Sequence, residues 1–137
     1  MVRRTRLAGG SRAAAFSLPS AIERPSRRTD SESLRNWYGL SQFEWAQVLG
    51  VSRSTVARWA AERSGPDPGS AEGRLFALLE DIRMLAEKLR RDPARFRVWL
   101  RAPSPALRGR PPADVLLRRG PVSIRDLLLD EFEGTYA

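Results

Sequence analysis

The feature that most constrains the fold is a series of helix start and stop signals separated by short apolar runs. Ser41 is followed three residues later by Glu44, which is the pattern of a capping box at a helix N-terminus. Gly39 and Gly50 each follow directly after a run with helical apolar spacing. Glycine is common at this position, just beyond the C-terminus of a helix. No stretch alternates apolar and polar residues as a half-buried strand does. The sequence therefore predicts an all-α fold.

These signals bound six or seven helices. In the first half we expect helices at 31–38, 42–49 and 53–62, followed by a long helix from a Ser70 cap to about residue 91. A further helix then begins at Pro93 and ends at a proline-rich loop, residues 102–112. A short helix at 112–119 and a last helix from a Ser123 cap to Gly134 complete the chain. In the long helix, residues spaced by three and four predict an apolar stripe. Its members are Leu75, Leu78, Ile82, Leu85 and Leu89, with Phe76, Leu79 and Ala86 beside them.

The composition excludes several classes of protein. The chain has no Cys and no His, which excludes zinc sites built on these residues, Cys nucleophiles, a His general base and disulfides. No paired-carboxylate motif stands out either, so we expect a protein that is not an enzyme, with no catalytic residue, no metal site and no cofactor. No apolar run approaches the roughly 20 residues that span a bilayer, which favours a soluble, cytoplasmic protein without a membrane partner.

Charge is concentrated near the N-terminus. The formal net charge is +8, and an excess of this size favours a polyanionic partner such as nucleic acid. Residues 1–29 hold seven arginines and one acidic residue, Glu23. The arginine bias suits phosphate binding, although a GC-rich genome produces the same bias. We interpret 1–29 as a flexible basic arm, followed by a DNA-binding domain at 30–69 and a second helical domain at 70–137.

The most specific segment is 34–59, LRNWYGLSQFEWAQVLGVSRSTVARW. Two short helices that cross steeply need a small residue at their contact and a tight turn between them, which Ala46 and Gly50 provide. Val51 and Val56 supply the apolar residues that follow the turn. The start of the second helix should then carry donors for phosphates and base edges. The candidates are Ser52, Arg53, Ser54, Thr55 and Arg58.

This segment resembles the Xre-type helix-turn-helix family through the pattern GLSQxExAxxLGVSRxTVxRW, with Trp45 as a bulky departure. The resemblance implies that Gln42 contacts phosphate and that Arg53, Ser54, Thr55 and Arg58 face the major groove of double-stranded operator DNA. Repressors of this kind bind two-fold sites as homodimers. Trihelical units of this type also occur in proteins that no longer bind DNA. Trp37 and Trp59 lie at helical positions where we expect them to pack in the core.

The second half contains Trp99, a loop with Pro103, Pro105 and Leu107, and then Pro112 and Asp114 at the start of a helix. This order resembles the toxin-binding domain of the Xre/MbcA/ParS antitoxins. The resemblance implies a type II toxin–antitoxin system whose RES-domain toxin degrades NAD. It also implies repression of the antitoxin's own operon and a C-terminal end placed at the toxin's active site. The toxin-binding residues it implies here are Trp99, Phe132, Gly134, Thr135, Tyr136 and Ala137.

The charge of the last helix agrees with a protein partner rather than DNA. After Arg125 there is no basic residue, whereas Asp126, Asp130, Glu131 and Glu133 are acidic. Such a surface suits a basic nucleotide-binding pocket, although an acidic helix is also an ordinary solvated face. The main alternative is a stand-alone helix-turn-helix regulator whose second half only dimerises. A scaffold protein with a degenerate DNA motif is a further alternative, and an enzyme is the weakest.

Overall fold

The computed structural model describes residues 29–136, so all of the expected basic arm except Thr29 lies outside the described residues. The described part consists of α-helices and one short 3-10 helix, with no strand, which confirms the all-α class. The elements are α1 (Ser31–Tyr38), α2 (Gln42–Leu49), α3 (Arg53–Glu62), α4 (Ala71–Lys88), α5 (Pro93–Arg101), η3 (Pro105–Leu107), α6 (Pro112–Arg119) and α7 (Val122–Tyr136).

The caps predicted for the first helices are confirmed. The Ser41 hydroxyl accepts a hydrogen bond from the Glu44 backbone N–H at 3.0 Å, and the Glu44 carboxylate accepts one from the Ser41 N–H at 3.0 Å. Gly39 and Gly50 have φ angles of 73° and 71°, the left-handed conformation that glycine adopts without strain. These local interactions fix the lengths of α1 and α2 independently of distant contacts.

The long helix α4 is shorter than expected. It ends at Lys88 rather than near residue 91, because Arg90 takes a left-handed φ of 61° that turns the chain toward Pro93. The predicted apolar stripe is also displaced. The side chains that lie deepest are Phe76, Leu79, Ile82 and Ala86, whereas Leu75, Leu85 and Leu89 pack at the edge of the core. Helix α4 therefore turns a slightly different face inward from the one that we expected.

The ends of α7 also differ from the expectation. The helix begins at Val122, so Ser123 lies inside it rather than capping it, and the Pro121 carbonyl accepts the Arg125 N–H at 2.9 Å. Gly134 does not end the helix, which continues to Tyr136. A glycine inside a helix costs only about 1 kcal/mol relative to alanine, which a helix can tolerate.

One hydrophobic core runs through both halves of the described chain. The Trp37 and Phe96 rings, from α1 and α5, lie 4.5 Å apart between centroids. The Tyr38 hydroxyl donates to the Leu79 carbonyl of α4 at 2.6 Å, and burial raises the pKa of this phenol well above its usual value. Trp37 and Trp59 are buried, as expected of core residues. The expected boundary at residue 69 is therefore crossed by a continuous core.

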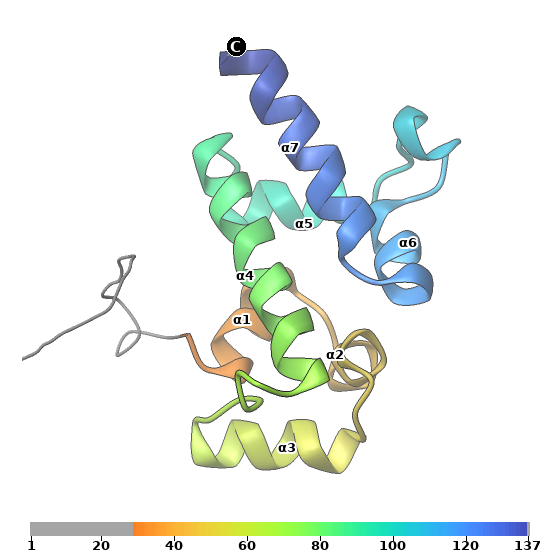
Figure 1. Cartoon of the computed structure of the whole chain (residues 1–137). Helices are drawn as coiled ribbons and strands as arrows, with labels where there is room; N and C mark the ends of the chain where they lie inside the picture. The colour runs from red at the N-terminus through yellow and green to blue at the C-terminus, as the bar shows by residue number, and fades with distance from the viewer. Residues whose placement is uncertain (1–28, 137) are drawn as a thin grey trace, which may run out of the picture.

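The molecule is elongated, with α3 at one end and the C-terminal end of α7 at the other (Figure 1). Helices α4 and α7 run side by side in the same direction, and α6 lies between α7 and α2. Within the described residues, none of the helices combines the length and the apolar character needed to cross a bilayer.

Candidate functional site

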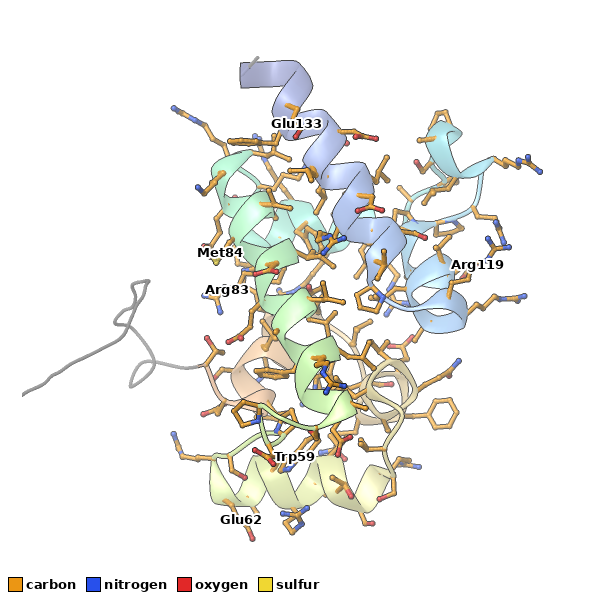
Figure 2. All side chains as sticks on the ribbon, viewed as in Figure 1. Trp59, Glu62, Arg83, Met84, Arg119 and Glu133 are labelled. Atoms are coloured by element: carbon orange, nitrogen blue, oxygen red, sulfur yellow. The ribbon has the colours of Figure 1, made fainter. Side chains whose placement is uncertain are left out.

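The outer face of α3 carries three of the six residues that we expected to contact DNA. Arg53, Ser54 and Arg58 are exposed there, whereas Val56 and Trp59 on the opposite side are buried against the body of the protein. Glu62 also points away from the body at this end of the molecule (Figure 2). The buried pair thus fixes the helix so that its polar side faces solvent.

The N-terminus of α3 is held by a small network of hydroxyl groups. Ser52 caps the helix by accepting the Thr55 N–H at 3.1 Å, and its hydroxyl also lies 3.0 Å from that of Ser54. Gln42 is half-buried at the first position of α2. Both helices therefore present their N-terminal ends, where unpaired backbone N–H groups and the helix dipole favour an anion.

The two arginines of this face differ in their surroundings. Arg58 pairs with Glu62 one turn later at 3.6 Å, and both side chains are more than half exposed, so the pair contributes little stability. Arg53 makes no ion pair with any described residue. Arg53 is therefore the cation of α3 that is most available to a ligand.

A second candidate site lies at the far end, where Arg91, just beyond the end of α4, links α5 to α7. Arg91 donates to the Glu131 carboxylate at 2.6 Å, and its guanidinium lies 5.3 Å from the Trp99 ring centroid. The Lys88 ammonium lies 5.9 Å from the Phe132 ring centroid. These contacts bring the neighbourhoods of Trp99 and Phe132 together, although the two residues are separated by 33 positions in the sequence.

A mostly apolar groove of about 280 Å³ runs between α4 and α7 beside this cluster. Met84 and Leu129 contribute exposed apolar surface, with exposed fractions of 55% and 36%. Large apolar side chains exposed together commonly mark a protein interaction surface. The full lining is Asp81, Met84, Leu85, Lys88, Arg125, Leu129 and Phe132.

Beyond Phe132, α7 projects past the ends of the neighbouring helices, and we call residues 133–136 the α7 tip (Figure 1). Glu133 and Gly134 are exposed in the tip, and Glu133 lies at the far end of the molecule from α3 (Figure 2). Thr135 and Tyr136 complete the helix, and Ala137 lies outside the described residues. Asp130 is exposed one turn before the tip, so this end of α7 is acidic.

Sequence reasoning missed the residues that position this second site. The sequence predicts Arg91 and Lys88 as part of the long helix but indicates no binding role for either residue. It also gives no sign that Met84 and Leu129 line a groove. The apolar spacing shows which residues line one side of each helix, but it does not show how α4 and α7 are aligned with each other. That alignment depends on contacts between residues about 40 positions apart, such as Arg91 and Glu131.

Besides the buried Tyr38, the groups with shifted pKa values belong to two ion pairs outside both sites. Hydrogen bonds from Arg101 lower the pKa of the Glu44 carboxyl, an effect that partial burial opposes and the Ser41 N–H reinforces. A hydrogen bond from Arg35 lowers the pKa of Glu32 in the same way. Among the described residues there is no cluster of acidic side chains that could hold a metal ion.

Comparison with protein families adds to this geometry. Residues 84–133 match the family model of the antitoxin Xre/MbcA/ParS C-terminal toxin-binding domain. The matched segment begins in the last turns of α4 and includes Trp99, Phe132 and every groove-lining residue except Asp81. It ends at Glu133, before the remainder of the α7 tip. No curated protein matches the chain.

Proposed function

We propose that the chain is the antitoxin of a type II toxin–antitoxin pair, because residues 84–133 match the model of the Xre/MbcA/ParS antitoxin C-terminal toxin-binding domain. Its partner is a RES-domain toxin that degrades NAD. The antitoxin neutralises this enzyme by direct binding, with the α7 tip at the entrance to the toxin's active site. The family match is the observation that carries the proposal.

The arrangement of the second site supports this role for the tip. Glu131 is bound to Arg91, and Phe132 lies beside Lys88, so the helix is held firmly up to these residues. The next residues, Glu133 and Gly134, are exposed. A helix that is anchored at its base and free at its end can enter a pocket without losing much conformational entropy. Its acidic charge matches a pocket that binds the phosphates of a nucleotide.

The groove between α4 and α7 supplies the apolar area that such a complex needs. Met84, Leu129 and Phe132 can act as apolar anchors, and Asp81, Lys88 and Arg125 form a charged rim. Stable protein interfaces commonly have this combination of an apolar centre and a polar edge. In this proposal the toxin covers the groove, and the tip reaches the active site.

We further propose that the α2–α3 unit is a helix-turn-helix with which the protein represses its own operon, as a homodimer on a two-fold site. The exposed Arg53, Ser54 and Arg58 support this role, and Ser52, Thr55 and Gln42 are placed at the adjoining helix ends. The alternative is a stand-alone regulator whose second half only dimerises, which would need no toxin.

Expression of the neighbouring toxin gene, alone and together with this chain, tests the antitoxin role. We expect the toxin alone to drain cellular NAD and stop growth, and co-expression of the chain to restore both. A harmless neighbour, or the absence of rescue, would favour the stand-alone regulator.

An Arg53→Ala variant tests DNA binding. Loss of one base contact should weaken binding to the operator by about 1–3 kcal/mol and relax specificity at one base position. Arg74→Ala, which removes an exposed arginine near the start of α4, is the matched control and should bind normally. Binding is measured by fluorescence anisotropy on the duplex upstream of the gene. Full operator affinity in Arg53→Ala would refute the assignment of α3.

A further inference from the structure

Charge is strongly segregated along the described chain. Residues 90–119 contain nine arginines and two acidic residues, Asp92 and Asp114, whereas residues 120–137 contain one arginine and four acidic residues. Asp92 is committed to capping α5, since it accepts the Arg95 N–H at 2.8 Å. The segment from 90 to 119 is therefore a second concentration of positive charge, separate from residues 1–29.

Most of the arginines near the core of this segment already have partners. Arg91 binds Glu131, Arg101 binds Glu44, and Arg97 donates to the Asn36 carbonyl at 2.6 Å. By contrast, Arg118 and Arg119 are exposed, and their side chains make no ion pair with any described residue. Their positive charge favours the C-terminal end of the α6 dipole, but it remains accessible from solvent.

Arg118 and Arg119 lie close to the α2–α3 unit, because the end of α6 is bound to α2. The Gln47 side-chain amide of α2 donates to the Leu117 carbonyl of α6 at 3.1 Å, which fixes the end of α6 against α2. Arg118 and Arg119 are the next two residues. Figure 2 shows Arg119 at the outer edge of α6, and α6 packs against α2. The pair thus flanks the helix that precedes α3.

The surroundings of the pair favour a polyanion over a protein partner. The apolar side chains of α6, among them Ala113, Val115 and Leu116, are buried. No large apolar residue between 99 and 119 is exposed. Protein interfaces are centred on aromatic or aliphatic anchors, which this surface lacks. Binding to the phosphate backbone requires only accessible positive charge.

We propose that Arg118 and Arg119 bind phosphate groups of duplex DNA on the α2 side of the segment that α3 contacts. The inference rests on the proposed DNA-binding function and extends the DNA interface into the toxin-binding family domain. These contacts position the protein and carry no sequence information.

The test measures how salt weakens binding of the full-length protein to a fluorescein-labelled 40-bp duplex of mixed sequence. Each lost phosphate contact should flatten the slope of log K against log[salt] by about 0.9. Because two contacts are lost from each protomer, we expect Arg118→Gln/Arg119→Gln to flatten the slope by about 1.8 for each bound protomer, or about 3.6 for the proposed homodimer. Arg118→Lys/Arg119→Lys keeps both charges and should keep the slope. Thermal unfolding followed by circular dichroism verifies that the glutamine variant is folded.

Arg108→Gln/Arg110→Gln is the matched control. It removes the same charge from the loop between α5 and α6, which lies on the side of α6 away from α3 (Figure 1). The control should retain the wild-type slope. An equal flattening in the control would attribute the effect to total charge and overturn the proposal. A folded Arg118→Gln/Arg119→Gln variant with an unchanged slope would also overturn it.

The outcomes also separate this inference from the proposed function. If Arg53→Ala weakens operator binding but the salt slope does not depend on Arg118 and Arg119, DNA binding by α3 stands and the inference fails. If the wild-type protein binds no duplex, both fail. A glutamine variant that loses toxin binding while its DNA binding is unchanged would assign this surface to the protein partner instead, against the proposal.

Discussion

At the scale of single residues, Glu44 combines two interactions of very different sequence range. Its capping box with Ser41 was predictable, because both partners lie within one helical turn. Its two hydrogen bonds with Arg101, at 3.0 and 3.1 Å, join α2 to α5 across 57 positions. No local sequence pattern predicts this pair, since any of the exposed arginines could have been the partner of Glu44.

This pair should make stability depend on pH. Because hydrogen bonds from Arg101 lower the pKa of Glu44 in the folded state from its usual 4.5, the ionised pair stabilises the fold above that value. This stabilisation is lost as the pH falls through the lowered pKa. A double-mutant cycle with Glu44→Gln and Arg101→Gln should give a coupling of about 0.2–1 kcal/mol at pH 7, measured by urea unfolding.

Glutamine is the suitable replacement at position 44 because it can still accept the capping hydrogen bond from Ser41. The coupling should therefore report the charge pair and not the cap. It should decrease as the pH falls below 4.5 and through the lowered pKa of Glu44. An equal coupling at pH 7 and at pH 3 would be inconsistent with a charge interaction.

At the scale of helices, local signals predicted the ends well where a side chain caps the backbone. The Ser41 and Ser70 caps are confirmed, and Ser52 and Asp92 cap their helices in the same way. The errors arose where tertiary structure decides. At α7, the helix begins at Val122 after the buried Pro121, and the capping preference of Ser123 has no effect. The buried face of α4 likewise depends on the helices that pack against it.

Two glycines inside helices should respond in opposite ways to alanine. Alanine ordinarily favours a helix over glycine by about 1 kcal/mol. At Gly73 in α4, however, an added Cβ would collide with the Asp67 carbonyl and lie 3.0 Å from the Pro68 Cα. We expect Gly73→Ala to destabilise the protein by about 1–3 kcal/mol in urea unfolding.

Gly134 in the α7 tip is the control for this comparison. An added Cβ there would meet no atom within 4 Å, so helix propensity alone should act. Gly134→Ala should be neutral or slightly stabilising. A stabilising Gly73→Ala would mean that the loop at Asp67 and Pro68 moves aside at little cost.

At the scale of the whole molecule, the two candidate sites lie at opposite ends (Figure 1). A toxin bound at the α7 tip would leave the outer face of α3 open to DNA, so the protein could bind both partners at once. The sequence alone predicts one of these candidate surfaces in the first half of the chain and the other in the second half. It did not reveal that α1, α4 and α5 share one core, because that requires contacts such as Trp37 with Phe96.

Because the two sites lie at opposite ends, a deletion at one end should leave binding at the other end unchanged. Deleting residues 133–137 removes the tip beyond Phe132 but leaves the core and the α3 face intact. The truncated protein should therefore fold and bind operator DNA normally. Only its action on the toxin should change.

The most direct test of the account measures NAD hydrolysis by the proposed partner, a purified RES-domain toxin, as the full-length or the truncated chain is added. We expect the full-length chain to stop hydrolysis at stoichiometric amounts. The chain without residues 133–137 should leave hydrolysis running, even if it still binds the toxin through the α4–α7 groove. Equal inhibition by a folded truncated chain would contradict the claim that the α7 tip blocks the active site.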